Sequence, residues 1–259
     1  MSSSAFKLEE IRKELASSKR YRLLKKIYSP NYPEIIDKNT SQLWDSLNDR
    51  VPISQRENPM AWDRISTAKK IIQEVVISRG KVLDVGFGSG DLENVVLNNK
   101  KGEYEWNGVD ISIESIKKLA SRYPSGKFKV GSIISLEFED GFFDCIIALE
   151  VLEHIRPSFT FKALSEVFKK LKKGGYFILS VPLNEGLQML LSHGKNPSAH
   201  VRDYSEELIR AELTIANFEI LKEKIFYAFS KWYTIKSLFT SAYKKVRSPN
   251  NILILAQKP

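Results

Sequence analysis

The 259-residue chain has one cysteine, Cys145, and no long apolar run. A single cysteine excludes an internal disulfide and a metal cluster built from cysteines, and it indicates a reducing, cytoplasmic setting. No stretch approaches the about 18 uncharged apolar residues that a membrane-spanning helix needs. The first ten residues lack the apolar region of a secretory signal peptide, so we expect none.

Histidine is also scarce, with only His154, His193 and His200. These residues do not form the H-E-x-x-H pattern of a zinc site, and we therefore expect no dedicated metal site. The sequence contains no internal repeat and no low-complexity segment. An apolar fraction of 42% is sufficient for the core of one α/β domain with additional segments.

The net charge of +9 is distributed unevenly. Residues 1–30 carry +5 and residues 225–259 carry +6, whereas residues 31–224 sum to −2. The basic character therefore belongs to the two ends of the chain. Such ends suit anionic lipid, nucleic acid or an anionic substrate, or serve only solubility.

A short apolar run, Val82–Val85, leads into a glycine-rich turn, and Asp91–Leu97 then has the pattern of a helix. A strand, a glycine turn and a helix in this order are typical of a nucleotide-binding crossover. Glycine adopts positive φ without strain and lets a ligand approach the backbone. The three glycines stand at alternate positions: Gly86, Gly88 and Gly90.

The turn does not match the common phosphate-binding patterns. A dinucleotide fingerprint places its third glycine one residue later, where this chain has Asp91, and no lysine follows as in a P-loop. The acids Asp84 and Asp91 would repel a pyrophosphate but suit an ammonium or a sulfonium. The pattern Asp-x-Gly-x-Gly-x-Gly resembles motif I of the class I S-adenosylmethionine (SAM)-dependent methyltransferases. A purely structural turn is the alternative.

Residues 104–112 are expected to form a second strand that ends at Asp110. An acid about 20 residues after a glycine loop is placed to accept hydrogen bonds from the two ribose hydroxyls. The alternative is that Asp110 caps the following helix, a role for which Ser112 competes. After a third strand, the resemblance places Ser132 and the Ile133 backbone at the adenine, although the family often has an acid there.

The stretch Phe142–Ile155 resembles the F-D-x-x-x-x-x-E-V-L-E-H motif of small-molecule methyltransferases, including quinone- and sugar-modifying branches. Its apolar part suits a central parallel strand with Cys145 in the core. The strand would end at Glu150, followed by Glu153 and His154, at the sheet edge where ligands bind. His154 is either a general base or a residue that packs the loop.

A further segment, His200–Ser205, resembles the family's H-V-R-x-(F/Y)-(S/T) segment, with Ser205 as the helix N-cap. We expect His200 and Arg202 to lie near the active-site edge, with His200 either binding substrate or acting as a base. Earlier in the chain, an amphipathic helix from Asp63 is expected to end near Arg79, with Gly80 as its C-cap.

Together these patterns predict an α/β fold with a Rossmann-like, doubly wound, seven-stranded sheet. The resemblance implies a mostly parallel sheet whose last strand is antiparallel, plus a helical N-terminal extension. We expect residues 1–60 to form a helical arm, either loosely packed or a lid over the pocket. Residues 61–259 would form the methyltransferase domain, with a basic aromatic insertion at about 229–248.

This insertion has apolar residues at near-helical spacing beside lysines, the pattern of a helix at the surface of an anionic membrane. The alternative is a helix that covers the substrate pocket or forms a dimer seam. We therefore expect a cytoplasmic protein with peripheral membrane contact as an option.

The resemblance implies a SAM-dependent methyltransferase that acts on an O, N or C nucleophile of a small molecule, lipid or glycan. The alternatives are an RNA methyltransferase and a non-catalytic SAM-binding or membrane-docking protein. Nucleic acid is the less favoured partner, because the Asn/Asp-Pro-Pro-aromatic motif of DNA amino-methyltransferases is absent. His154 and His200 are the candidate bases. The candidate cofactor-binding residues are Asp84, Gly86, Phe87, Gly88, Gly90, Asp110, Ile111, Ser132, Ile133, Leu149 and Glu150.

Overall fold

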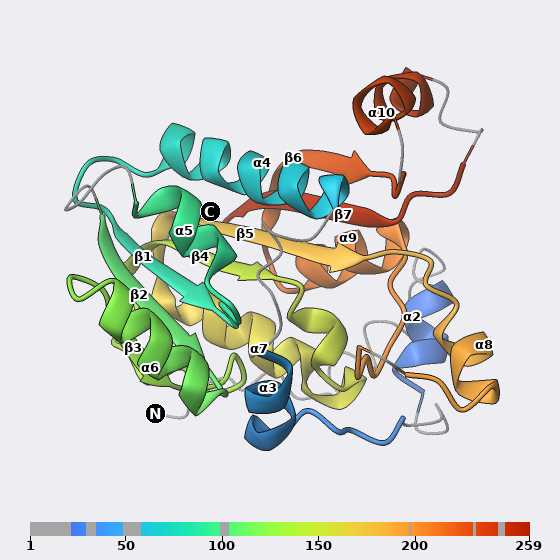
Figure 1. Ribbon diagram of the computed structural model, residues 1–259, viewed down its shortest axis with the longest axis horizontal. Helices are drawn as coiled ribbons and strands as arrows, with labels where there is room; N and C mark the ends of the chain where they lie inside the picture. Colours follow the sequence, from blue (N-terminus) through green and yellow to red (C-terminus); the bar gives the residue numbers. More distant parts are fainter. Residues whose placement is uncertain are drawn as a thin grey trace.

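The structure is a computed structural model that describes residues 22–29, 35–48, 58–98, 104–196, 198–229, 232–242 and 247–259. Its centre is one seven-stranded sheet with the strand order β3-β2-β1-β4-β5-β7-β6 (Figure 1). The strands are β1 (Lys81–Val85), β2 (Glu105–Asp110), β3 (Lys127–Val130), β4 (Phe143–Leu149), β5 (Leu171–Pro182), β6 (Glu219–Phe226) and β7 (Asn251–Gln257).

The sheet is parallel except for its last strand. The pairs β1–β2, β1–β4, β2–β3 and β4–β5 are parallel, and β7 runs antiparallel to both β5 and β6. This arrangement confirms the predicted seven-stranded, doubly wound sheet, including its antiparallel last strand.

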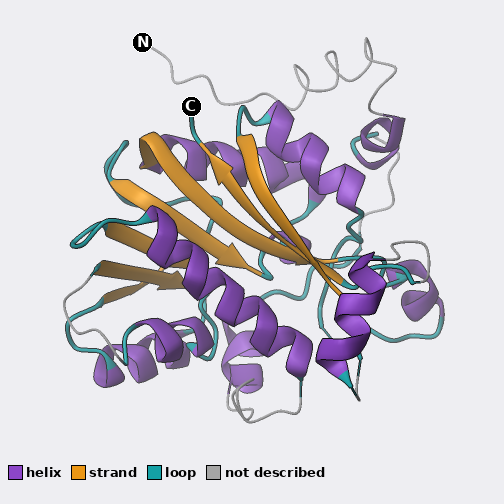
Figure 2. Ribbon diagram, turned by 90° about the horizontal axis from the view of Figure 1, so that it is seen from above, coloured by secondary structure: helices purple, strands orange, loops and turns teal. Residues whose placement is uncertain are grey.

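Helices cover both faces of the sheet (Figure 2). The helices are α2 (Arg22–Ile27), α3 (Ser41–Asn48), α4 (Pro59–Val75), α5 (Asp91–Val96), α6 (Ile113–Arg122), α7 (Pro157–Lys170), α8 (Leu187–Ser192), α9 (Glu206–Ile215) and α10 (Tyr233–Ala242), with a 3₁₀ turn, η2, at Leu152–His154. Along β1, Val82 packs in the core with α4 and α5, whereas Leu83 packs in the core with α7 and α9. The alternation follows from the two-residue period of a strand buried on both faces. Cys145 is fully buried in the core, as predicted.

The strand order reverses at the centre of the sheet. From β1 the chain passes outward to β2 and β3, then returns to place β4 on the other side of β1. In open α/β sheets, the crevice beyond the carboxyl ends of the strands at such a reversal is where ligands bind. We therefore expect a ligand site at the segments that follow β1, β2 and β4.

Helix α4 differs from the prediction at both ends. It begins at Pro59, with the side chain of Asn58 accepting a hydrogen bond from the Ala61 amide, and it ends at Val75. The left-handed residue in the following turn is Arg79, with φ 63°, rather than Gly80. A Cβ atom at Gly80 would lie 2.4 Å from Val76 Cγ1. This glycine is therefore needed for close packing and not for a helix C-cap.

A buried polar network joins α2 to α9. Glu212 accepts hydrogen bonds from the hydroxyls of Tyr28 (2.7 Å) and Tyr204 (3.0 Å), and it pairs with the Arg202 guanidinium. Arg202 also donates to the Thr160 hydroxyl. The expectation that Arg202 lies at the active-site edge is wrong. This side chain is 1% exposed because it neutralises the buried Glu212 carboxylate.

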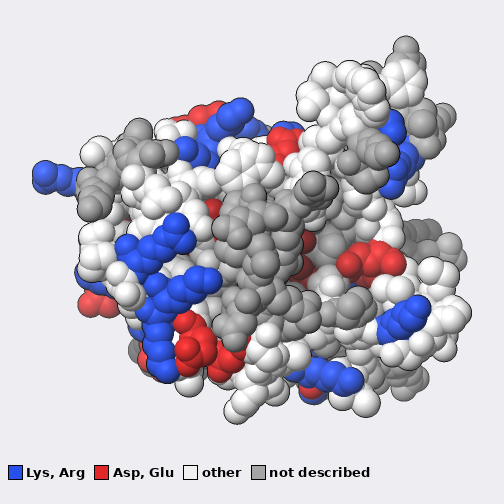
Figure 3. Space-filling model, viewed as in Figure 1, with Lys and Arg blue, Asp and Glu red and all other residues white. Residues whose placement is uncertain are grey.

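Helix α10 projects from the body of the molecule, and Figure 3 shows its visible surface as mostly uncharged. Four large apolar side chains of this region are exposed: Trp232, Ile235, Leu238 and Phe239. Within the described segments, we find no helix with the length and hydropathy required to cross a membrane.

Candidate active site

Two adjoining pockets open at the carboxyl ends of β1, β2 and β4. The first, of about 460 Å³, extends toward the ends of β2 and β3, and the second, of about 610 Å³, extends toward α4, β5 and β7. The residues shared by the two pockets are Trp44, Gly86, Gly88, Glu150 and His154. The two pockets thus form one elongated site around the glycine turn.

The glycine turn has the conformation that its sequence predicts. Gly86, Gly88 and Gly90 have φ values of 72°, 54° and 78°. The Gly88 amide donates a hydrogen bond of 2.8 Å to Asp110 Oδ2, which links the turn to the end of β2. Gly90 lines neither pocket, and a Cβ there would lie 2.6 Å from Leu119 Cδ1. The packing of α6 against the turn therefore accounts for the third glycine.

Asp110 faces the first pocket and is not the cap of α6. Its Oδ1 accepts a hydrogen bond from the Ser112 amide, and the Ser112 hydroxyl caps the helix by accepting from the Ser115 amide. Burial raises the pKa of Asp110, while the Ser112 and Gly88 amides oppose that shift. Each carboxylate oxygen has two acceptor sites. One backbone donor on each oxygen therefore leaves acceptor capacity for a ligand hydroxyl.

Three buried carboxyl groups lie close together beneath the glycine turn. Burial and the neighbouring Glu93 raise the pKa of Asp84, with a smaller contribution from Asp110. Burial raises the pKa of Glu93 to about 7, and its carboxylate accepts a hydrogen bond of 3.1 Å from Trp106 Nε1. Because burial and the neighbouring carboxyl groups disfavour the ionised form of Asp84, a cationic ligand beside it would stabilise that form.

Glu150 stands between the two pockets in a left-handed conformation, with φ 58°. Its carboxylate pairs with Arg64 at 3.1 Å and accepts hydrogen bonds from the Ser180 hydroxyl (2.7 Å) and the Asn251 amide (2.9 and 3.0 Å). Positive φ is uncommon outside glycine, and strained positions of this kind concentrate at ligand sites. Contacts from α4, β5 and β7 hold the side chain at the junction of the pockets.

The remaining predicted cofactor-binding residues line one pocket or the other. Ile111, Ser132 and Ile133 line the first pocket, and Phe87 and Leu149 line the second together with Asp84. Apart from Gly90, every residue predicted from the sequence to bind the cofactor lies on the pocket walls.

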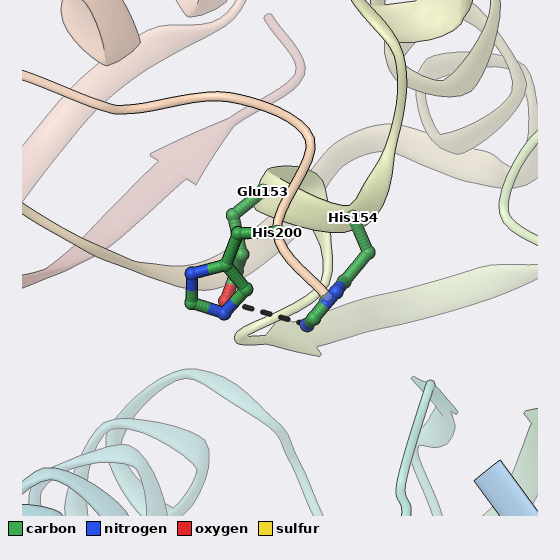
Figure 4. A group of neighbouring side chains, drawn as sticks. All are labelled: Glu153, His154 and His200. Carbon is green, nitrogen blue, oxygen red and sulfur yellow. Dashed lines mark ion pairs between the residues drawn. The ribbon is translucent and has the colours of Figure 1, made fainter. Parts of the chain in front are cut away.

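The two candidate bases come together with Glu153 (Figure 4). One ligand atom from each of Glu153, His154 and His200 lies within 4.8 Å of the others. The imidazole rings of the two histidines meet edge to face, with centroids 4.8 Å apart. The sequence argued against a metal site because its three histidines show no zinc spacing, whereas the fold brings two of them beside a carboxylate.

Burial dominates the electrostatics of this cluster. It lowers the pKa of His154 to about 3, assisted by His200. Burial also raises the pKa of Glu153 well above its ordinary value, and Glu150 adds to that shift. His200 Nδ1 lies 2.6 Å from Glu185 Oε2, and the second pocket contains both residues.

A segment from the N-terminal part of the chain covers one side of the site. Asp37 and Asn39 line the first pocket, and Trp44 lines both pockets. Asn39 Nδ2 donates a hydrogen bond of 3.0 Å to the Ala199 carbonyl, and the Trp44 ring meets His154 edge-on at 4.9 Å. Residues 35–48 therefore contribute directly to the pocket walls.

Sequence reasoning missed Arg64, Trp44 and Asn251 as site residues, whereas the end of the fifth strand at Pro182 does indicate that Glu185 could face a substrate. Arg64 could have been found, because it stands within the apolar stripe of α4, between Ala61 and Ala68, where a surface helix places no charge. Trp44 and Asn251 come from separate parts of the chain, and no local pattern marks them.

The comparisons with known proteins agree with this geometry. The sequence model of the family described as "Methyltransferase domain" matches residues 52–223. A 2-methyl-6-phytyl-1,4-hydroquinone methyltransferase of Synechocystis sp. is 26% identical over 163 residues, covering 54% of this chain and 49% of that protein. A carboxy-S-adenosyl-L-methionine synthase of Campylobacter jejuni is 22% identical over 222 residues, covering 85% of this chain and 90% of that protein.

Among solved structures, the N-methyltransferase NodS of Bradyrhizobium japonicum WM9, in complex with S-adenosyl-L-homocysteine, superposes with a TM-score of 0.62 at 15% identity. That superposition covers 85% of this chain and 99% of NodS, and it shows that the fold is shared. The chain spans about half the length of the first curated relatives that it matches, 52% and 49% of them. Because the family match extends over more than half of its residues, the chain belongs to the methyltransferase-domain family.

Proposed function

We propose that SAM lies across both pockets, with its nucleoside in the first and its methionine part in the second. Asp110 would accept hydrogen bonds from the ribose hydroxyls, and Ser132 with Ile133 would contact the adenine. The residues fit this ligand, because the Asp110 carboxylate faces the first pocket beside the apolar Ile111 and Ile133. The position of Asp110 against the Gly88 amide is the observation on which the proposal depends.

The second pocket offers matching charges to the methionine part. Asp84 suits the ammonium group, since it lies among buried carboxyls that a positive charge would stabilise. Arg64 Nε is buried without a hydrogen-bond acceptor among the described residues, and it belongs to a side chain that lines this pocket. We assign Arg64 to the methionine carboxylate, with Glu150 orienting the guanidinium through their 3.1 Å contact.

The bound cofactor would supply an activated methyl group for in-line displacement by an O, N or C nucleophile. The contribution of the protein is mainly alignment, which provides up to about 7–11 kcal/mol in well-oriented cases. The segment 35–48 would act as part of a lid that excludes water, because Trp44 and Asn39 already contact the pocket. In this proposal residues 1–60 form the N-terminal arm, of which the described α2 packs against α9, and residues 61–259 form the catalytic domain.

The second pocket favours a small-molecule, lipid or glycan acceptor over RNA. Five acidic side chains line it: Asp84, Asp91, Glu150, Glu153 and Glu185. Arg64 is the one Lys or Arg among the described residues of this lining, and it pairs with Glu150, whereas the binding of a polyanionic strand depends on Lys and Arg contacts to phosphates. A neutral or cationic acceptor, such as a ring hydroxyl or an amine, is compatible with this lining.

His154 and His200 are the candidate bases for an acceptor that must lose a proton. His200 is the better placed of the two, because the contact of its Nδ1 with Glu185 Oε2 at 2.6 Å fixes the orientation of the ring. His154 is enclosed by Trp44 and by His200, and burial makes it a weak base.

We also propose that α10 docks on an anionic membrane surface from the cytoplasmic side. Trp232 and Leu238 are 72% and 69% exposed, so the apolar face predicted for residues 229–248 covers no pocket in its described part. The exposed Lys236 lies between them in the sequence and suits anionic headgroups. Flotation with anionic liposomes should retain the wild type and lose the double variant Trp232→Ser, Phe239→Ser. Equal flotation of both proteins would contradict this contact.

The enzymatic proposal is tested by supplying SAM with a labelled methyl group to the protein and a fractionated extract. Label should enter a small-molecule or lipid fraction and should require the wild-type pocket, with Asp110→Ala inactive at low SAM concentration. Label in the RNA fraction, sensitive to salt, would favour the RNA alternative. SAM binding without any transfer would favour a non-catalytic role.

A further inference from the structure

Glu153 is unusual among the acidic residues of the site. Its side chain is 0% exposed, and neither carboxylate oxygen receives a hydrogen bond from another residue in the described parts of the chain. His154 Nδ1 is likewise buried without a partner there. A buried polar group without a partner costs about 1–3 kcal/mol, and more when it is charged. Such a group in a native structure indicates that something else completes its contacts.

The neighbours of Glu153 are nitrogen donors of the kind that metals bind. Glu153 Oε1 lies 4.0 Å from His154 Nε2, and Figure 4 shows both side chains converging with His200. One ligand atom from each residue lies within 4.8 Å of the others. With metal–ligand bonds of about 2.0–2.2 Å, two ligands of one ion lie up to about 4 Å apart. Small rotations of these side chains would bring all three atoms onto one ion.

The surroundings of His200 fix the orientation that a ligand needs. Its Nδ1 lies 2.6 Å from Glu185 Oε2, so this nitrogen carries the proton and donates to the carboxylate. The other ring nitrogen then keeps its lone pair. Metal-binding histidines commonly have a carboxylate in this position, which orients the ring and increases its basicity. Glu185 is therefore a positioning residue in this arrangement.

We propose that Glu153, His154 and His200 bind one divalent first-row transition-metal cation, such as Zn²⁺, Mn²⁺ or Fe²⁺. Two imidazoles and one carboxylate form a mixed set of donors that these ions accept. The cation would complete the contacts of the buried Glu153 carboxyl group, whose oxygens receive no hydrogen bond from another described residue. The proposal concerns a binding site and goes beyond the methyl transfer proposed above.

The location of the cluster suggests what the cation would do, and this step depends on the proposed methyl transfer. All three residues line the second pocket, where the acceptor would lie. Three protein ligands leave open positions on the ion for an acceptor hydroxyl. Coordination would lower the pKa of the hydroxyl, so its proton passes to solvent, and His200, as a ligand of the ion, would then not act as the base. The oxygen then forms the bond to the methyl carbon as the carbon–sulfur bond breaks and its electron pair stays on sulfur.

The test uses the full chain, treated with a chelator, dialysed and titrated with Co²⁺ as a spectroscopic probe. We expect visible d–d absorption that saturates at one equivalent and that Zn²⁺ abolishes by displacement. Glu153→Gln and His200→Ala should each lose this absorption. Glu185→Gln should weaken Co²⁺ binding by about 10–100-fold, as expected for a residue that acts through a ligand.

His193→Ala is the matched control, because His193 is the one histidine of the chain that lies outside the cluster. It should leave the titration unchanged. Calorimetry with SAM on each variant checks that the site is folded, independently of any transfer reaction. No saturable absorption in the wild type would overturn the proposal. So would equal Co²⁺ binding by the wild type and a folded Glu153→Gln variant, or a loss of binding in His193→Ala.

Discussion

Two buried glutamates show how differently this protein treats an interior carboxylate. Glu212 is 0% exposed and is surrounded by Arg202 and two tyrosine hydroxyls. Glu153 is equally buried but receives no hydrogen bond from another described residue. The first is neutralised by the fold itself and joins α2 to α9. The second lines the second pocket, where we propose that a bound cation contacts it.

The comparison distinguishes a buried carboxyl group that stabilises the fold, Glu212, from one that lines the candidate site, Glu153. Removing one partner of a buried ion pair leaves an uncompensated charge and is strongly destabilising. A buried carboxyl group without a partner is already destabilising to the folded protein. Groups of this kind concentrate at functional sites. Four changes test or refine this contrast.

The largest effect should follow Arg202→Met. This substitution leaves Glu212 buried without its cation, and we expect a loss of about 3–5 kcal/mol in the free energy of unfolding, measured with urea. Arg210→Met is the control on α9, because Arg210 pairs with Glu206 and Glu223 at a half-exposed surface and should cost about 1 kcal/mol or less. Similar losses of stability in both variants would show that the buried Arg202–Glu212 pair contributes no more than the partly exposed ion pairs of Arg210.

Glu93 offers a test by pH. Burial raises its pKa from the ordinary 4.5 to about 7. Between these values the folded protein holds more protons than the unfolded chain, so the free energy of unfolding falls as pH rises through this window. The Glu93→Gln variant keeps an acceptor for Trp106 and should lack this fall, which is on the order of 3 kcal/mol. If the free energies of unfolding of the wild type and the Glu93→Gln variant change in parallel from pH 4.5 to 7.5, the raised pKa of Glu93 is contradicted.

Asp110 is intermediate between the two glutamates, since two backbone amides satisfy part of its carboxylate. Asp110→Ala should weaken SAM binding by about 1.5–3 kcal/mol, the usual range for hydrogen bonds to a charged group, and calorimetry measures this directly. Asp140→Ala serves as the control, because Asp140 is largely exposed and pairs with Lys170 away from the site. Unchanged affinity in Asp110→Ala would remove the ribose assignment.

The smallest effect concerns Glu153 itself. In the presence of a chelator, Glu153→Gln replaces a buried carboxyl group that receives no hydrogen bond from another described residue, and it should change the free energy of unfolding by about 1 kcal/mol or less. The equivalent Glu212→Gln change should destabilise the protein, because the guanidinium of Arg202 then lacks its partner. A clear loss of stability in Glu153→Gln would place Glu153 in the same class as Glu212.

The parts predicted best from the sequence are those whose signal is local. The glycine turn, Asp110 and the run from Leu149 to His154 each sit where one strand ends. In a parallel sheet these ends meet at one edge, so local patterns were sufficient to assemble a site. The antiparallel β7 came from the family resemblance, which the strand pairing confirms.

The parts that were missed depend on contacts between distant segments. Glu185 and His200 approach one another through loops that flank α8, and Asn251 reaches Glu150 from the last strand. Arg202 shares its segment with His200, yet it turns into the core, because the partner that decides its position is Glu212 on α9. Neither the spacing nor the composition of these segments reveals which side chains will meet.

The most direct measurement is a crystal structure of the protein with S-adenosyl-L-homocysteine. We expect the ribose hydroxyls within hydrogen-bond distance of Asp110, the adenine beside Ser132 and Ile133, and the sulfur directed toward the second pocket. A nucleoside located elsewhere on the protein, or side chains that fill the first pocket and exclude the ligand, would contradict the account.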